Sequence, residues 1–143
     1  MTLYLDTSSL IKLYVSEIGT DAVRQAIGEA TIVSTSVVAY AETRAGLARL
    51  RREGQLDTSE FASAKRQFEE QWSTYFAVEV TDSLCRAAGD LAERYALRGF
   101  DSIHLASFAE VARGAGARQT RFSSFDSALN RAARLLSRKL AHA

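Results

Sequence analysis

Cysteine and proline are nearly absent from this 143-residue sequence, which contains one cysteine, Cys85, and no proline. A single cysteine excludes a disulfide within the chain and suits a reducing compartment, so we expect a cytoplasmic protein. Because Cys85 lies beside Leu84 in a helical pattern and no other Cys or His clusters with it, we expect a packed core thiol rather than a metal thiolate. Without proline, the turns have to be inferred from glycine and polar residues.

Long apolar runs and a strong net charge are also absent. No window approaches 18 consecutive apolar residues, and no basic region precedes a long apolar run at the N-terminus, so we expect neither a membrane span nor a signal peptide. The net charge of +1 indicates no particular class of partner. The composition, 47% hydrophobic and 24% charged, is that of an ordinary globular protein, and the length favours a single domain over residues 1–143.

Short apolar segments alternate with segments of helical periodicity along the chain. The expected strands are residues 2–6, 31–34, 77–80 and 120–124. The expected helices are residues 21–30, 36–52, 57–72, 82–96, 101–113 and 126–140, and Asp57 with Glu60 resembles a capping box at the start of the third. This alternation predicts an α/β fold with a mostly parallel sheet of four to five short strands, covered by helices on both faces.

Four acidic residues interrupt or flank these apolar segments at similar places. Asp6 ends the first strand, and Asp126 follows the last. Glu42 lies about two turns into the helix after the second strand, beside its apolar face, and Asp101 opens a helix that is apolar on most sides. Ligand sites in open parallel sheets form beyond the carboxyl ends of the strands, so we expect the four carboxylates to reach one rim.

Converging carboxylates repel one another and cost several kcal/mol each to bury, so such a cluster requires protons or a cation. Oxygen ligands without nearby His or Cys favour Mg²⁺ or Mn²⁺ over zinc. A water bound to such an ion becomes a nucleophile once its pKa is lowered, and the ion also neutralises phosphate charge. The pattern therefore predicts metal-dependent hydrolysis of a phosphodiester.

Each acidic residue also has an ordinary structural interpretation. Asp101 and Asp126 stand where a helix N-cap is common, Asp6 can be a turn residue, and Glu42 can be an exposed helix residue. A non-catalytic interaction module whose acidic residues are caps is therefore an alternative. A phosphatase with Asp6 as covalent nucleophile would require a second aspartate two residues later, where Ser8 stands.

Four segments of the sequence resemble the PIN-domain ribonucleases, specifically the VapC toxins of bacterial type II toxin–antitoxin pairs. They are "LYLDTSSLIKLY", "STSVVAYAETRAGLARL", "LRGFDSIHLASFAE" and "FSSFDSALNRAA". They occur in the family's order and cover nearly the whole chain. The resemblance implies a PIN-like three-layer α/β/α fold and a Mg²⁺- or Mn²⁺-dependent endoribonuclease. It also implies a homodimer and a small cognate VapB-type antitoxin, whose tail often carries an arginine into the acidic site.

The resemblance also implies roles for individual residues. The family's four acidic positions, which bind the metal and activate water, correspond here to Asp6, Glu42, Asp101 and Asp126. Asp6 and Asp101 match the most direct ligands. Ser8 matches a small polar position that supports the site, and Ser124 is assigned the same role beside Asp126.

Basic residues gather after Glu42 and near the last strand. They are Arg44, Arg49, Arg51, Arg52, Lys65, Arg66, Arg118 and Arg121. A solvated charged face and a phosphate-binding surface both fit this pattern. We expect Arg44 and Arg121 to be the RNA contacts, because they lie close in sequence to Glu42 and Asp126.

Two further features are expected to belong to the core. His104 lies one turn after Asp101, and we interpret it as a histidine hydrogen-bonded in or near the core rather than a catalytic base. Four aromatic residues follow at helical spacing, namely Phe61, Phe68, Trp72 and Phe76. We expect them to pack in the core, and the resemblance adds a dimer face and an antitoxin groove in the same helical region.

Overall fold

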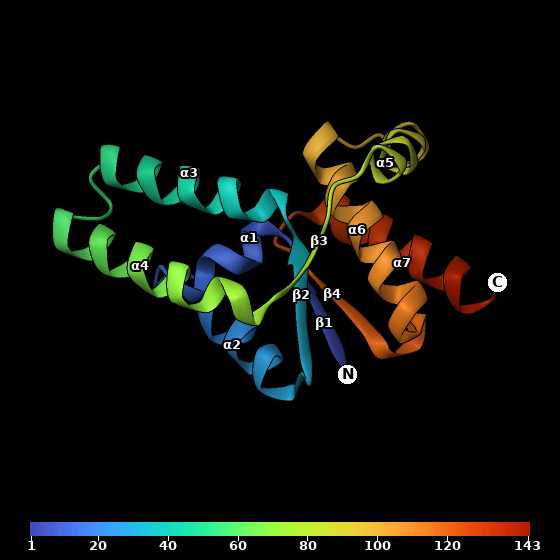
Figure 1. Cartoon of the computed structure of the whole chain (residues 1–143), viewed down its shortest axis with the longest axis horizontal. Helices are drawn as coiled ribbons and strands as arrows, with labels where there is room; N and C mark the ends of the chain where they lie inside the picture. The colour runs from blue at the N-terminus through green and yellow to red at the C-terminus, as the bar shows by residue number, and fades with distance from the viewer.

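Four short parallel strands form the central sheet of this computed structural model, which describes residues 1–143 (Figure 1). They are β1 (Thr2–Leu5), β2 (Ile32–Ser36), β3 (Phe76–Val78) and β4 (Thr120–Ser123). Their order is β3-β2-β1-β4, and Thr2 pairs in register with Ile32 of β2 and Thr120 of β4. The predicted parallel sheet is confirmed, with β1 in its interior.

Helices connect the strands and cover the sheet. The α-helices are α1 (Thr7–Leu10), α2 (Thr20–Glu29), α3 (Val38–Arg52), α4 (Thr58–Gln71), α5 (Asp82–Tyr95), α6 (Gly99–Ala115) and α7 (Ser127–Ala141). Short 3-10 helices are η1 (Ile11–Leu13), η2 (Trp72–Thr74) and η3 (Ala117–Gln119). The long helices match the predicted segments. The short α1–η1 segment is additional, and it directly follows Asp6.

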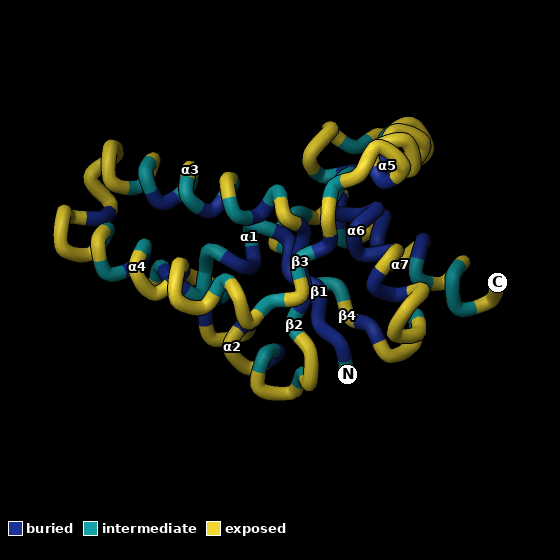
Figure 2. The backbone as a smooth tube through the Cα atoms, viewed as in Figure 1, coloured by how far each residue is buried: buried dark blue, intermediate teal, exposed yellow.

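The side chains of β1 connect two hydrophobic layers, one on each face of the sheet. Tyr4 packs in the cluster formed with α5, α6 and α7, whereas Leu3 and Leu5 pack in the cluster formed with α1, α2, α3 and α4. Successive side chains of a strand point to opposite faces, which is why one strand serves both layers. Figure 2 shows β1 and α6 as the buried centre of the molecule. The expected three-layer α/β/α fold is confirmed, and no helix is long and apolar enough to cross a bilayer.

The helices α3 and α4 form an antiparallel pair that extends from the sheet (Figure 1). The predicted capping box starts α4, because Asp57 accepts from the Glu60 N–H and Glu60 accepts from the Asp57 N–H. Phe68 is fully buried, with its ring centroid 5.3 Å from that of Tyr14. Core packing is wrong for Phe76, which is 61% exposed because it lies on the edge strand β3.

The expectation of a packed core thiol at Cys85 is also wrong, since this residue is exposed. The buried face of α5 carries Leu84, Ala88 and Leu91. Cys85 follows Leu84 by one residue, which places it about 100° around the helix and away from that face. Sequence proximity to a buried leucine therefore does not bury its neighbour.

We expect Phe68→Ala to lower the free energy of unfolding by about 3–5 kcal/mol, because it empties a fully buried aromatic position. Phe76→Ala is the matched control, and its cost should stay below about 1 kcal/mol because that ring is largely exposed. Urea unfolding followed by circular dichroism measures both. Equal losses in the two variants would contradict the described packing.

Candidate active site at the carboxyl ends of the strands

The carboxyl ends of β1 and β4 meet at one edge of the sheet, and an aspartate follows each of them. Leu5 pairs in parallel register with Ser123, and the Asp6 N–H donates to the Ser123 carbonyl oxygen at 3.1 Å. Asp6 is the N-cap of α1, and Asp126 is the N-cap of α7. The strand register therefore brings these two sequence-predicted residues to the same rim.

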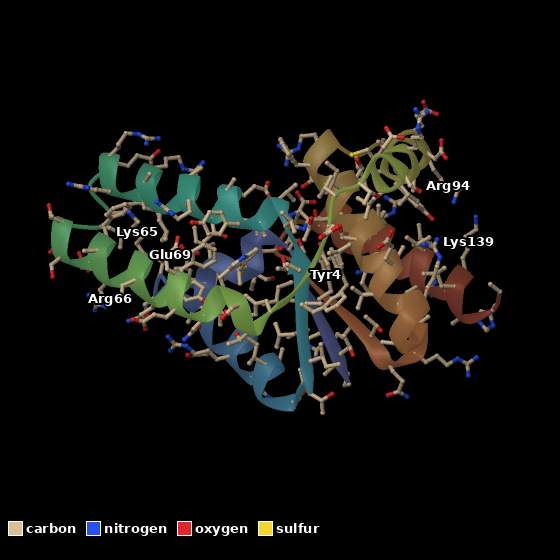
Figure 3. All side chains as sticks on the ribbon, in the orientation of Figure 1. Tyr4, Lys65, Arg66, Glu69, Arg94 and Lys139 are labelled. Carbon is tan, nitrogen blue, oxygen red and sulfur yellow. The ribbon has the colours of Figure 1, made fainter.

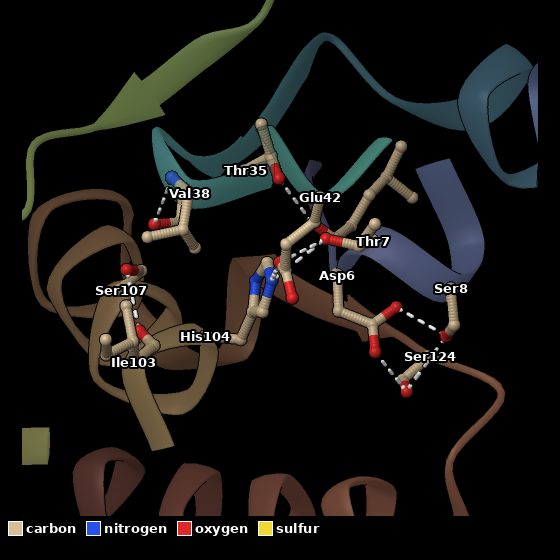
Figure 4. Close-up of polar contacts among 12 residues, drawn as sticks. Asp6, Thr7, Ser8, Thr35, Val38, Glu42, Ile103, His104, Ser107 and Ser124 are labelled. Atoms are coloured by element: carbon tan, nitrogen blue, oxygen red, sulfur yellow. Dashed lines mark hydrogen bonds and ion pairs between the residues drawn. The ribbon is translucent and has the colours of Figure 1, made fainter. Parts of the chain in front are cut away.

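Asp6 is a buried carboxylate held by neutral hydrogen-bond donors. It is 4% exposed. Its Oδ1 accepts from the Ser9 N–H at 3.0 Å and from the Ser8 hydroxyl at 2.7 Å, and its Oδ2 accepts from the Ser124 hydroxyl at 2.5 Å (Figure 4). No Lys or Arg forms an ion pair with it. Its negative charge therefore has no full cationic partner within the chain.

The two serines that hold Asp6 also fix the turn between β4 and α7. Ser8 Oγ accepts from the Phe125 N–H at 2.9 Å, and Ser124 Oγ accepts from the Asp126 N–H at 3.0 Å. Each hydroxyl thus donates to Asp6 and accepts from the backbone of that turn. This links the residue after β1 to the residue after β4, and both serines lie where the resemblance implies supporting positions.

Glu42 is held at the same rim by a chain of polar contacts that begins inside the core (Figure 4). Its Oε1 accepts from the Thr7 hydroxyl at 2.6 Å and lies 2.8 Å from His104 Nε2, while His104 Nδ1 lies 2.8 Å from the Tyr4 hydroxyl. Burial raises the pKa of Tyr4 well above its ordinary value, so its hydroxyl stays protonated and donates to Nδ1. Nε2 then carries the proton and donates to Glu42. His104 is buried and hydrogen-bonded, as expected, and it orients Glu42.

Asp101 contacts a residue that the sequence analysis did not select. It lies in the first turn of α6, and its Oδ2 is 3.2 Å from Nε of Arg98, the residue that precedes the helix. Nη2 of the same guanidinium lies 3.9 Å from Asp126 Oδ2. Arg98 is 84% exposed along its side chain, so it reaches both carboxylates from the solvent side. An arginine three residues before an aspartate at a helix start was the available signal.

The capping interpretation accounts for two of the four acidic residues. Asp6 accepts from Ser9 N–H, and Asp126 accepts from Leu129 N–H at 2.8 Å, so both are N-caps. Asp101 is not a cap, because the N-cap of α6 is Arg98 and no backbone N–H donates to the Asp101 carboxylate. Glu42 lies inside α3 and contacts only side chains. Two carboxylates therefore face this rim with no role in starting a helix.

Comparison with known proteins agrees with this geometry. The sequence model of the PIN domain matches residues 3–135. This chain belongs to the PIN-domain family. It is similar to Ribonuclease VapC45 and Ribonuclease VapC49 of Mycobacterium tuberculosis, from strains CDC 1551 and H37Rv. Each is 38% identical over 104 residues, which cover 73% of this chain and 72% of the relative. The resemblance to VapC-type PIN domains is confirmed.

The acidic rim of this PIN domain is not a preformed metal cage. No group of three or more Asp, Glu, His or Cys side chains is placed to hold one ion. The expected crowding of carboxylates is replaced by contacts to protein donors. Serine hydroxyls hold Asp6, His104 and Thr7 hold Glu42, and Arg98 lies between Asp101 and Asp126.

The structure brings neither of the expected RNA contacts to this rim. Arg44 pairs with Glu69 at 2.8 Å, and Glu69 lies on the side of α4 that faces α3 (Figure 3). Arg121 lies 3.6 Å from Glu29, which ends α2 just before β2 begins, at the opposite end of the sheet. Two residues separate Arg44 from Glu42, which places their side chains on nearly opposite faces of α3.

The pKa directions of two carboxylates reflect their different surroundings. Burial raises the pKa of Asp6, and the hydrogen bonds from Ser124 and Ser8 offset this only in part. Burial would also raise the pKa of Glu42, but the hydrogen bonds from His104 and Thr7 bring that pKa below its ordinary value. The charged form of Asp6 is thus disfavoured in the folded protein, whereas that of Glu42 is favoured.

We expect Asp6→Asn to raise the melting temperature at pH 7 in buffer with EDTA. A folded pKa above the unfolded value means that ionised Asp6 destabilises the fold, and that this cost disappears as the pH falls below the unfolded pKa of 3.8. The gain over wild type should therefore shrink between neutral pH and pH 3.8. Calorimetric melts across this range measure it.

Asp57→Asn is the control for this experiment. Asp57 is an exposed N-cap, and asparagine caps helices about as well as aspartate. Its melting temperature should follow that of wild type at every pH. A lower melting temperature of Asp6→Asn at pH 7 would contradict the described cost of burying this carboxylate.

Proposed function

We propose that this chain is a divalent-metal-dependent endoribonuclease, the toxin of a type II toxin–antitoxin pair. One observation carries the proposal: Asp101 and Glu42 face the rim without capping a helix, beside a buried Asp6 that lacks a cationic partner. Membership of the PIN-domain family and similarity to two proteins named ribonucleases support it.

The donor set at the rim fits Mg²⁺ or Mn²⁺. It consists of oxygens, with Asp6 and Asp101 as the proposed direct ligands and Glu42 and Asp126 as further ligands, directly or through water. Hard oxygen donors suit these ions, which retain bound water more readily than they accept a closed protein cage. When bound, the ion supplies a water of lowered pKa and neutralises charge on the scissile phosphate.

The residues of this chain prepare the site for that chemistry. Ser8 and Ser124 orient the two oxygens of Asp6, and His104 with Thr7 keeps Glu42 ionised and in place. Asp126 uses Oδ1 to cap α7, and its Oδ2 remains on the side of Asp101. Arg98 occupies the space between these two carboxylates and leaves it when a divalent ion arrives, because a mobile exposed side chain holds it there.

We propose a small VapB-type antitoxin and a homodimeric assembly for this chain. The contacts of Arg98 support the first of these, because they demonstrate that a guanidinium fits between Asp101 and Asp126. An antitoxin arginine placed there would neutralise the same two carboxylates. The homodimer rests on family membership alone.

A non-catalytic interaction module is the second candidate. The N-cap roles of Asp6 and Asp126 and the lack of a preformed metal cage favour it. It predicts no RNA cleavage in any divalent ion.

We expect Asp6→Asn to reduce Mg²⁺- or Mn²⁺-dependent RNA cleavage by at least about 100-fold while the protein stays folded. Loss of residues that merely orient a metal ligand costs about 10–100-fold, and loss of a ligand should cost at least as much. Cleavage of labelled RNA on denaturing gels measures the rate, and circular dichroism checks the fold. Asp57→Asn should cleave as wild type does. Full activity of folded Asp6→Asn would argue strongly against a metal site here.

We expect Arg98→Gln to tighten Mn²⁺ binding by up to about 5-fold. Exposed ion pairs contribute roughly 0.2–1 kcal/mol, and this amount no longer has to be overcome when the guanidinium is absent. Isothermal titration calorimetry measures the affinity. Arg86→Gln, which breaks an exposed pair with Asp82 outside the site, should leave it unchanged. Weaker Mn²⁺ binding by Arg98→Gln would show that this arginine supports the ion site rather than competing for it.

A further inference from the structure

A groove of about 450 Å³ opens beside the acidic rim and follows α3 away from it. It is lined by Ser8 and Ile11 on the α1–η1 side and by Glu42, Gly46, Arg49 and Arg52 on α3. Glu42 is the only acidic residue in its lining, and it stands at the end next to Asp6 and Ser8. The groove is therefore negative where it joins the rim and positive at its other end.

The two arginines of this groove are the unpaired ones on their helix face. Arg49 and Arg52 follow Glu42 by seven and ten residues, which keeps all three on one face of α3. Neither arginine forms an ion pair, whereas Arg44 pairs with Glu69. Arg51 stacks over the ring of Phe61 on α4, at 5.0 Å. The helix thus divides its arginines between α4 and the groove.

The close packing of η1 against α3 forms the wall opposite these arginines. A Cβ added to Gly46 would lie 2.7 Å from Ile11 Cδ1, so only glycine lets these elements approach as they do. Both residues line the groove. Its shape is therefore set by rigid elements rather than by a loop.

We propose that this groove binds the RNA strand on one side of the scissile bond, with Arg49 and Arg52 contacting its phosphates. This inference deepens the nuclease assignment and rests on it. From Glu42 to Arg52 the axis of α3 advances about 15 Å, the length of roughly four nucleotides in a stacked strand. A strand whose scissile phosphate lies at the rim must continue along an adjoining surface, and this groove offers positive charge without an acid partner.

The experiment measures binding separately from cleavage. Fluorescence anisotropy with a labelled single-stranded RNA in EDTA gives the affinity at several salt concentrations. Arg49→Gln/Arg52→Gln should bind at least about 10-fold more weakly than wild type, and its salt slope should fall by about 1.4, because each lost phosphate contact on a single strand removes about 0.7.

Two further double variants remove the same charge elsewhere. Arg51→Gln/Arg66→Gln, from the side of α3 that faces α4 and from the exposed surface of α4 (Figure 3), should bind RNA within about 2-fold of wild type. Arg44→Gln/Arg121→Gln tests the pair that sequence proximity favours. An equal loss in the Arg51/Arg66 variant, a larger loss in the Arg44/Arg121 variant, or no RNA binding by wild type would each overturn the groove assignment.

The two proposals fail in distinguishable ways. If wild type binds RNA through Arg49 and Arg52 but does not cleave it in Mg²⁺ or Mn²⁺, the nuclease assignment fails and the groove assignment stands. If wild type cleaves and the Arg49/Arg52 variant binds and cleaves equally well, the reverse holds. A glutamate-rich peptide that displaces RNA at lower charge concentration would assign the groove to an acidic protein segment and overturn the RNA assignment.

Discussion

The burial of one negative charge, that of Asp6, is the constraint on which the rest of the site depends. Parallel pairing of β1 with β4 fixes this residue at the sheet edge, and hydrophobic layers on both faces exclude water from it. Its partners are hydroxyl and backbone donors, which lower the cost of the charge without neutralising it. Such an arrangement is stable enough to fold, and it leaves the carboxylate suited to a cation.

The fold was largely predictable because its determinants are local and periodic. Buried parallel strands are short apolar runs, and the helices between them carry one apolar face, so the element bounds follow from the pattern of residues such as Leu3, Leu84 and Leu91. The errors occurred where tertiary context decides. Phe76 continues an aromatic stripe but lies on an edge strand, and Cys85 lies one residue beyond a buried position.

The site was predictable in its acidic residues but not in their partners. Asp6 and Asp126 follow strands, so topology alone places them at one edge. The contact between Glu42 and His104 joins residues 62 positions apart, and no local pattern encodes it. Arg44 illustrates the opposite error, since closeness in sequence to Glu42 places it on another face of the helix. Helical phase, rather than distance along the chain, selects Arg49 and Arg52.

Helix capping and metal binding are compatible uses of the same carboxylate here. Asp126 caps α7 through Oδ1 while its Oδ2 lies toward Arg98, so capping fixes the side chain without using both oxygens. Asp101, which caps nothing, is held only by that exposed arginine. The rim therefore combines rigidly placed carboxylates with one easily displaced cation.

Melting of the wild-type protein and of Asp101→Asn during a Mn²⁺ titration tests most directly whether these carboxylates together bind a divalent ion. Asp101 has no capping role, so its substitution changes the rim without removing a helix cap. A shared ion predicts that wild type gains several degrees at saturating Mn²⁺ and that Asp101→Asn gains little. The same gain in both proteins, or none in wild type, would contradict a metal site at this rim.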